Sequence, residues 1–401
     1  MSSNARLQTL SLAALSQAWS DILRNTRPLS RNTAGVDGVT VNDFAENPKY
    51  SLQGLARTLA RGNFQFSELR PVLIKKPNGK DRLICVPTVK DRVVQKALLN
   101  FLSEKYHGKL ANSISYGFIK DRSVKDAAAI ACVERARNAW VFKTDITAFF
   151  DTVDRGILES VLTKVIRERS LHGLLIDAMH CEVRPPSSGA SQRRIATLGI
   201  KLGKGLRQGM PLSPFFSNLL LGAFDNQVVK AGIPAVRYAD DLIFFSSSWA
   251  DCVRIADFCH KQFAKINLTI PPLDSPASKS VIYAPHEPAE FLGLELAPCI
   301  HGFELRLSEK QRERIRDEML CYGSIKELLS RKVTLRTLGA VLVAKRNGYL
   351  AAYENCANIS DVEAQLKGLE RKCLVKIYQN ELKMDLPKLG AEAHTFLGLG
   401  T

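Results

Sequence analysis

Two adjacent aspartates, Asp240 and Asp241, interrupt the apolar run VRYADDLIFF at residues 236–245. Burying an ionised carboxylate is costly unless a cation or hydrogen-bond donors compensate for the lost water. Neighbouring residues of a strand also point to opposite faces. The two carboxylates can therefore share one site only if the chain turns here. The sequence predicts a hairpin over residues 234–247 with the aspartates near its tip.

A second apolar run, WVFKTD, ends on Asp145, which is the natural third member of a carboxylate cluster. Carboxylate clusters bind hard divalent cations, most naturally Mg²⁺. Two such ions support in-line displacement at a phosphate, because one activates the attacking oxygen and the other stabilises the leaving group. A lone Asp-Asp pair is more often a pair of turn or cap residues, so the pair needs support from elsewhere in the chain.

The segment KKPNGKDR, residues 75–82, supplies a basic hairpin. Two β-rich runs flank Pro77-Asn78-Gly79, which is a turn signal. Alternating side chains could direct Lys75 and Arg82 at a triphosphate. Taken alone, the segment is more simply interpreted as a charged turn.

The overall composition favours a folded protein with an anionic partner. The chain has 401 residues, of which 45% are hydrophobic and 24% charged, enough for more than one core. Its 56 Lys and Arg residues outnumber its 40 Asp and Glu residues, for a formal net charge of +16. This excess indicates a polyanionic partner such as nucleic acid.

Targeting signals and metal-binding cysteine pairs are missing from the sequence. There is no apolar run of about 18 residues and no signal-peptide centre near the N-terminus, so no membrane association is expected. The nine cysteines are scattered and form no Cys-x-x-Cys pair, so a zinc site is not expected. Scattered thiols suit a reducing compartment, and we expect a cytoplasmic protein.

Periodicity predicts a mixture of helices and strands up to about residue 305, and only helices after it. The expected helices cover residues 5–24, 50–62, 88–106, 155–182, 213–232 and 249–267, with short strands at 280–307 and a basic loop at 184–205. Capping boxes are expected at Ser308–Gln311 and Ser360–Glu363. The expected domains are an N-terminal helical extension (1–30), a central domain (31–305) and a helical domain (306–401).

Seven segments, in order, resemble blocks of the reverse transcriptases of the group II intron-like bacterial lineage. The resemblance is strong over residues 30–300 and weak beyond. The segments are TAGVDGVT (33–40), PVLIKKPNGKDRLICVPTVKDRVVQKAL (71–98), SYGFIKDRSVKDA (115–127), FKTDITAFFDTV (142–153), GLRQGMPLSPFFSNLLL (205–221), YADD (238–241) and EFLGLEL (290–296).

The resemblance implies an α+β right-hand polymerase fold, with fingers and palm in residues 31–305 and a helical thumb in residues 306–401. It implies RNA-templated DNA synthesis from dNTPs. Asp145, Asp240 and Asp241 would hold two Mg²⁺ ions, with Mn²⁺ as an alternative, and the carbonyl of Ile146 would be a further ligand.

The resemblance also assigns nucleotide-binding roles. Lys75 and Arg82 would bind the incoming triphosphate, and Phe150 would be the steric gate beneath the sugar. Gln208 would lie under the nucleotide or the template base, within a block that contacts template and nucleotide.

Two positions depart from the family pattern. Arg207 stands where the lineage usually has proline, which predicts an altered template-side loop and an added charge beside the active site. Lys279 matches a lysine that precedes the primer grip, but its loose spacing in DSPASKSVIY favours an ordinary surface lysine.

The segment RNGYLAAYENC (346–356) resembles the thumb helix of intron enzymes, and no pattern of a nuclease or finger domain follows it. We therefore expect a standalone, anti-phage defence-associated reverse transcriptase that copies a partner non-coding RNA into DNA. A second protein or a second copy of the chain is a further candidate partner. The alternatives are a group II intron-type or retron reverse transcriptase, an RNA-binding maturase-like protein and an RNA-dependent RNA polymerase; the aromatic Phe150 argues against the last.

Overall fold

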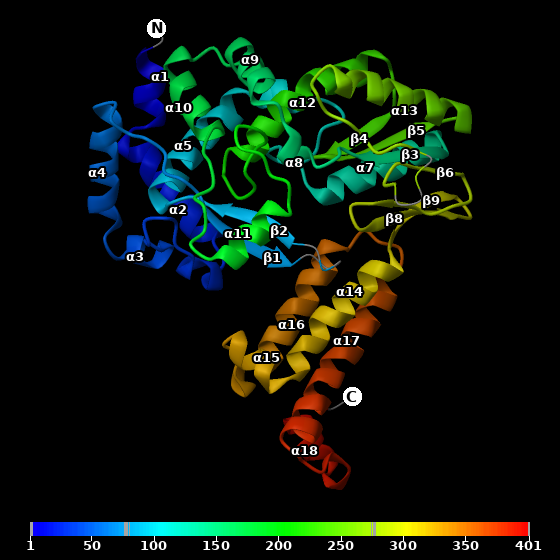
Figure 1. The fold of residues 1–401 in the computed structure, drawn as a ribbon. Helices are drawn as coiled ribbons and strands as arrows, with labels where there is room; N and C mark the ends of the chain where they lie inside the picture. Colours follow the sequence, from blue (N-terminus) through cyan, green and yellow to red (C-terminus); the bar gives the residue numbers. More distant parts are fainter. Residues whose placement is uncertain (1–2, 76–78, 80, 274, 276–277, 400–401) are drawn as a thin grey trace. The chain divides into compact units, whose positions relative to one another are not determined.

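The computed structural model describes residues 3–75, 79, 81–273, 275 and 278–399 (Figure 1). The chain divides into two compact units, each assembled from separate stretches of sequence. Unit 1 comprises residues 1–122, 144–242 and 253–281, and unit 2 comprises residues 123–143, 243–252 and 282–401. The expected domain boundaries near residues 30 and 305 stay predictions.

Unit 1 is largely helical. Its described helices are α1 (Ser3–Thr9), α2 (Leu12–Asn25), η1 (Pro28–Asn32), α3 (Val41–Glu46), α4 (Pro48–Ala60), α5 (Val89–Lys105), α6 (His107–Leu110), α8 (Phe149–Thr152), α9 (Arg155–Val165), α10 (Arg169–Met179), α11 (Gly189–Ala196), α12 (Ser213–Lys230) and most of α13 (Trp249–Ala264). Helix α2 packs against α4 and α5. The first half of helix α12 is buried on nearly all sides. In its second half, Phe224 stacks on Phe263 of α13 with ring centroids 4.2 Å apart.

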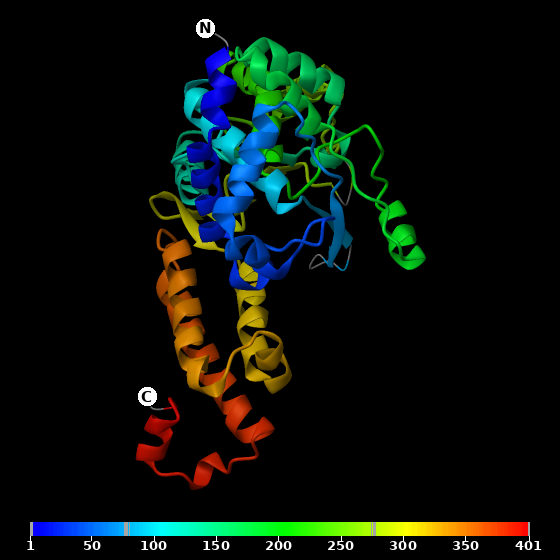
Figure 2. The same ribbon diagram turned by 90° about the vertical axis from the view of Figure 1, so that its left-hand side faces the viewer.

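Three of the expected elements differ from the structure. The single helix predicted at 5–24 is two helices, because Ser11 caps α2 by accepting a hydrogen bond from the backbone N–H of Ala14. The helix predicted at 155–182 is also divided, into α9 and α10, and residues 166–168 separate them. The region predicted as a basic loop at 184–205 contains helix α11, which stands out from unit 1 in Figure 2.

Strands β1 (Arg70–Lys75) and β2 (Asp81–Val86) form the predicted antiparallel hairpin in unit 1. Lys76, Pro77, Asn78 and Lys80 of its turn lie outside the described residues. Beside the hairpin, Arg194 of α11 donates two hydrogen bonds, of 2.9 and 2.8 Å, to the Asp81 carboxylate.

A four-stranded sheet has the order β4–β5–β3–β6, with β4 Ala235–Tyr238, β5 Asp241–Ser246, β3 Trp140–Asp145 and β6 Val281–Tyr283. Strands β3 and β5 are central in this sheet and mostly buried, which explains the apolar stretches Val141–Phe142 and Leu242–Phe245. Each of them runs from one unit into the other along the chain.

Unit 2 contains helix α7 (Val124–Arg137) and a meander of β7 (Ala289–Phe291), β8 (Leu294–Cys299) and β9 (Gly302–Leu307). Its later described elements are all helical: α14 (Glu309–Leu320), η2 (Cys321–Gly323), α15 (Ile325–Ser330), α16 (Leu335–Ala352), α17 (Ile359–Val375), η3 (Lys376–Glu381), η4 (Leu386–Lys388) and α18 (Ala391–Phe396). Helix α17 packs against both α14 and α16 (Figure 1).

Of the two capping boxes expected in unit 2, the structure contains only the Ser308 cap. Ser308 caps α14 by accepting from the N–H of Gln311, but the Gln311 side chain bonds the Tyr353 hydroxyl and does not close a capping box. The box predicted at Ser360–Glu363 is wrong, because α17 already begins at Ile359. In the part of the chain that the structure describes, no helix is both long and apolar enough to cross a bilayer.

Candidate active site

The two adjacent aspartates lie at the tip of a β-hairpin, as predicted. Strand β4 ends at Tyr238 and β5 begins at Asp241, so Ala239 and Asp240 form the turn. Ala239 adopts a left-handed backbone with φ of 57°, which is uncommon for a residue with a Cβ atom. The turn breaks the strict alternation of a strand, which otherwise sends neighbouring carboxylates to opposite faces.

The end of β3 meets this hairpin tip. The backbone N–H of Ile146, the residue after Asp145, donates a hydrogen bond to the carbonyl of Asp240 over 3.2 Å. Asp145 and Ile146 are both buried. The third predicted carboxylate is thus brought beside the pair, although it lies almost a hundred residues earlier in the chain.

The electrostatics of the cluster confirm this proximity. Burial raises the pKa of the Asp240 carboxyl, and the negative charge of Asp145 raises it further. The positive charges of Lys279 and Arg82 act in the opposite direction. Among the described residues, no group of three or more His, Cys, Asp or Glu side chains is arranged to hold a metal ion.

Lys279 was interpreted from its loose spacing as an ordinary surface lysine, but the structure places its ammonium group against the carboxylate of Asp145. This hydrogen bond raises the pKa of Lys279, and the charges of Asp145, Asp241 and Asp240 add to the effect. The side chain remains 73% exposed. Lys279 therefore enters the acidic cluster from its solvent side.

In the segment after Asp145, the two neighbouring phenylalanines Phe149 and Phe150 differ in burial. Phe149 is 2% exposed, whereas Phe150 is only partly buried. They lie on a short helical turn, α8, and not on a strand, because Ala148 before them takes a left-handed φ of 45°. The carbonyl of Phe150 accepts a hydrogen bond of 2.6 Å from the N–H of Leu206.

The Gln208 loop is held against both the α8 segment and the β2 strand. A Cβ on Gly205 would lie 2.6 Å from the Phe150 carbonyl oxygen, so only glycine fits there. The carbonyl of Gln208 accepts from the N–H of Cys85 over 2.7 Å. Gly209 has a φ of 112°, and a Cβ atom on it would lie 2.5 Å from the Cys85 carbonyl oxygen. Gln208 itself is partly exposed.

Arg207 does not present the free charge that the sequence suggested. It is 4% exposed and donates hydrogen bonds of 2.6 and 3.0 Å to Glu182. Arg155 donates to the other oxygen of the same carboxylate over 2.7 Å, as does the N–H of Gly203 over 2.9 Å. The arginine that replaces the usual proline therefore anchors its loop internally.

Lys75 and Arg82 lie on neighbouring rungs of the β1–β2 hairpin, where Lys75 pairs with Asp81 and Arg82 with Ile74. Neighbouring rungs project to opposite faces of a ribbon, so alternation alone does not aim both cations at one point. Lys75 also lies 3.5 Å from the Asp81 carboxylate. Both side chains are exposed, and the charge of Arg82 reaches Asp240.

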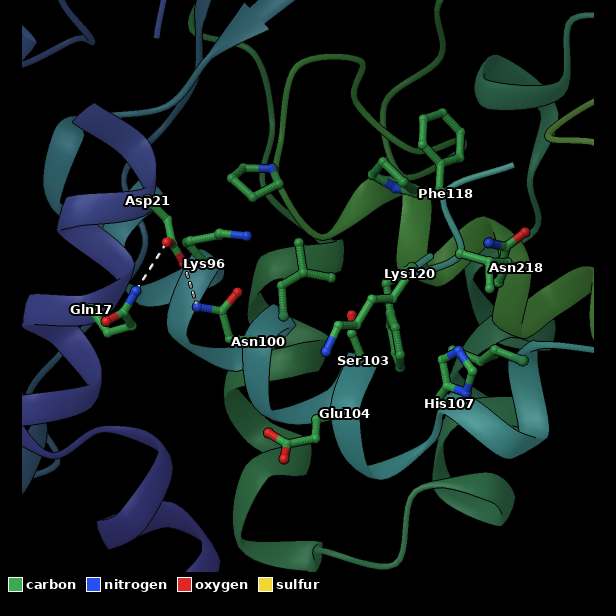
Figure 3. Close-up of a pocket in the computed structure, with 16 residues that line it drawn as sticks. Gln17, Asp21, Lys96, Asn100, Ser103, Glu104, His107, Phe118, Lys120 and Asn218 are labelled. Carbon is green, nitrogen blue, oxygen red and sulfur yellow. Dashed lines mark hydrogen bonds between the residues drawn. The ribbon is translucent and has the colours of Figure 1, made fainter. Parts of the chain in front are cut away.

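A cavity of about 680 Å³ lies in unit 1 between α2, α5, the 118–120 loop and the start of α12 (Figure 3). On one wall, Asp21 accepts hydrogen bonds from Gln17 and Asn100. On the opposite wall stands Phe118, whose ring is 52% exposed and lies 6.3 Å from that of Tyr238 in the hairpin. Phe118 thus lines the cavity and also lies near Tyr238, the last residue of strand β4.

Residues 74–296, more than half of the chain, match the protein family described as "Reverse transcriptase (RNA-dependent DNA polymerase)". The chain belongs to the reverse transcriptase family. The expected right-hand polymerase fold, with mixed helices and sheets, is therefore confirmed. The carboxylate cluster, the β1–β2 hairpin and the Gln208 loop all lie within the matched reverse transcriptase region.

Several curated proteins are similar to this chain over part of their length. Protein YkfC of Escherichia coli (strain K12) is 31% identical over 202 residues, covering 48% of this chain and 49% of that protein. Group II intron-encoded protein LtrA of Lactococcus lactis subsp. cremoris is 24% identical over 200 residues, covering 50% of this chain and 31% of that protein. The chain thus spans about half or less of the length of these relatives.

Among solved structures, a partial Cas6-RT-Cas1–Cas2 complex matches with a TM-score of 0.38 and 22% sequence identity, covering 64% of this chain and 41% of the other.

Proposed function

We propose that this reverse transcriptase family member is an RNA-directed DNA polymerase, which extends a primer on an RNA template with dNTPs. The observation that carries the proposal is the meeting of Asp145, at the end of β3, with the Asp240–Asp241 hairpin tip. A cluster of carboxylates, in which Asp145 is buried and Asp240 and Asp241 are partly buried, beside a lysine and an arginine is suited to bind cations and the triphosphate of a nucleotide.

The chemistry of these side chains fits divalent metal ions, because oxygen-only carboxylate donors are those that Mg²⁺ and Mn²⁺ prefer. The side chains of Asp145, Asp240 and Asp241 are not arranged to hold a metal ion in this structure, and they would hold two such ions after turning toward one another. The Ile146 carbonyl is proposed as a further ligand. Bound metal ions of this kind activate an attacking hydroxyl and stabilise a leaving phosphate. The Asp145 oxygen that contacts Lys279 has to be released before a metal ion can bind there.

The residues around the cluster orient the nucleotide. Arg82, whose charge already reaches Asp240, is proposed to bind the triphosphate together with Lys75. Phe150 is proposed to lie under the sugar, where a flat ring leaves no room for a 2′ hydroxyl. Its partial exposure next to the buried Phe149 supports this assignment. Gln208 is proposed to lie under the nucleotide or the template base.

The cavity beside the hairpin is proposed to hold the unpaired template strand. Its exposed Phe118 ring offers a stacking surface for a base. Lys96 and Lys120, on opposite sides of the cavity in Figure 3, supply positive charge for phosphates. The formal net charge of +16 is consistent with this polyanionic partner.

We further propose that the template is a partner non-coding RNA and that the DNA product serves anti-phage defence in the cytoplasm. Support for this finer assignment is analogy with the standalone enzymes of the group II intron-like bacterial lineage that the sequence motifs resemble. The similarity to a group II intron-encoded protein favours an alternative, in which the enzyme copies an intron RNA. Sequencing the RNA and DNA that co-purify with the protein separates these two templates.

Primer extension with purified protein tests the central proposal. We expect dNTP incorporation on an RNA template in the presence of Mg²⁺ or Mn²⁺. Binding of RNA without any incorporation would favour a maturase-like binding protein, and preferred incorporation of rNTPs would favour an RNA polymerase.

A further inference from the structure

A buried ion pair joins the hairpin that carries Asp240 and Asp241 to helix α12. Arg237, on strand β4, is 1% exposed, and Asp225, on helix α12, is fully buried. The Arg237 guanidinium donates to both oxygens of the Asp225 carboxylate, over 2.7 and 2.5 Å. A buried pair of this kind is stable only when the remaining donors and acceptors also have partners.

The remaining donors of Arg237 all have partners. Its side chain carries five N–H groups. Besides the two that bond Asp225, one bonds the Ser115 hydroxyl over 2.7 Å, one the Asn218 side-chain oxygen over 3.0 Å, and one the Ala239 carbonyl over 3.0 Å. Arg237 therefore joins helix α12 and the segment around Ser115 to the turn of the catalytic hairpin.

The Ala239 carbonyl is the one backbone acceptor of this guanidinium, and it belongs to the residue with the left-handed φ of 57°. Gly117 also packs directly against the backbone of this turn. A Cβ atom on Gly117 would lie 2.3 Å from the backbone nitrogen of Ala239. Asn218 completes the arrangement, because its side-chain amide donates to the Gly117 carbonyl over 2.8 Å.

We infer that Arg237 is a positioning residue, which holds Ala239 in its left-handed conformation and thereby sets the direction in which Asp240 and Asp241 leave the turn. This role rests on the proposed function, in which both aspartates hold the metal ions. Asn218 belongs to the same arrangement: it is 2% exposed and bonds Arg237 and Gly117, although its sequence block was expected to contact template and nucleotide.

The test compares Arg237→Lys with Arg135→Lys. Lysine keeps the charge but cannot serve five separate acceptors. Arg135 is a matched control, because it is also fully buried and donates to the backbone carbonyls of Leu296, Ala284 and Glu287 in unit 2. The measurements are kcat and KM for dNTP incorporation, hydrogen exchange of the backbone amides of residues 236–242, and thermal melting.

For Arg237→Lys we expect kcat to fall about tenfold or more, since small misplacements of reacting groups have effects of that size. KM for dNTP should stay within about twofold of the parent value, because the binding contacts of the triphosphate are elsewhere. The amides of residues 236–242 should exchange faster. Arg135→Lys should lower the melting temperature while its folded fraction keeps the parent kcat and the parent exchange at the hairpin.

The inference is overturned if Arg237→Lys melts earlier but keeps the parent kcat and the parent exchange at residues 236–242. Should Arg237→Lys fail to fold, Ser115→Ala removes a single acceptor of the guanidinium, and unchanged exchange and kcat in that variant also overturn the inference. If the parent protein does not polymerise, the proposed function fails on its own. Hydrogen exchange then still decides whether Arg237 holds the turn.

Discussion

The ammonium group of Lys279 contacts the carboxylate of Asp145, a residue 134 positions earlier in the chain. Asp145 ends the buried strand β3, whereas Lys279 reaches it with a largely exposed side chain. The charges of Asp240 and Asp241 also act on this lysine. Lys279 therefore offsets the repulsion among the carboxylates of the cluster, and it would compete with the proposed metal ion for the same oxygen.

Lys279→Met should raise the affinity of the protein for Mn²⁺ several-fold, because the competing ammonium group is gone. Titration of the protein with Mn²⁺, followed by electron paramagnetic resonance, measures this without any nucleotide. Lys265→Met is the control, since Lys265 is an exposed lysine that bonds Gln262. Equal Mn²⁺ affinity in parent and Lys279→Met would show that the contact does not compete with metal binding.

The paired substitution Asp240→Ala and Asp241→Ala should abolish polymerisation while the fold survives. Loss of the carboxylates that are proposed to hold the metal ions is expected to lower the rate roughly a thousandfold or more. The melting temperature should stay equal or rise, because a partly buried carboxylate that is repelled by the charge of Asp145 is removed. Primer extension and thermal melting check both parts, with the exposed Asp257→Ala as control. Undiminished incorporation by the double variant contradicts the site.

Phe150→Ala should let the enzyme accept ribonucleotides far better, with a modest loss of dNTP use and little loss of stability. Phe149→Ala should instead destabilise the protein by about 3–5 kcal/mol, because its ring is fully buried. Single-nucleotide incorporation of dNTP and rNTP, together with melts, distinguishes the two. An unchanged sugar preference in Phe150→Ala excludes it as the steric gate.

The paired substitution Lys96→Ala and Lys120→Ala should weaken RNA binding and reduce the slope of log affinity against log salt by up to about two. For the parent, affinity should fall about tenfold or more between about 50 and 200 mM salt. Lys261→Ala with Lys265→Ala is the matched control, because Lys261 is exposed on α13 and Lys265 is exposed directly after it. Equal salt slopes for all three proteins would mean that the cavity does not contact phosphates.

Glu182→Gln should lower the stability at neutral pH by about 3 kcal/mol, because Arg155 and Arg207 lose the carboxylate that pairs with both. Burial acts to raise the pKa of the Glu182 carboxyl, but the hydrogen bonds from Arg207 and Gly203 and the charges of the two arginines outweigh it and lower that pKa.

The sign of the pH effect at Glu182 follows from the lowered pKa. Its contribution to stability is present above the ordinary pKa of a glutamate and is lost as the pH falls through the lowered value in the folded protein. The difference in unfolding free energy between parent and Glu182→Gln should therefore shrink in acid. Denaturant unfolding at a series of pH values measures it, and a constant difference would contradict the ion-pair account.

The local sequence pattern was sufficient to predict the hairpin with its aspartate pair, the strand that ends at Asp145 and the β1–β2 hairpin. In each case an alternating or continuous apolar run and a turn limit what the backbone can do. The ordered motifs were also sufficient for the family. The sequence pattern does not predict where the helices end at Ser11 and at residues 166–168, because the apolar helical spacing continues across both sites.

The sequence by itself determined that carboxylates had to meet at a turn, because buried charges require a shared cation. Only the tertiary structure decided which cation pairs with each acidic side chain. Lys279 reaches Asp145, Arg207 pairs with Glu182, and Arg237 pairs with Asp225 and also bonds Ser115 and the Ala239 carbonyl of the hairpin turn. These partners lie on separate helices, strands and loops, so no local spacing encodes them, and burial selects them only when the chain has folded.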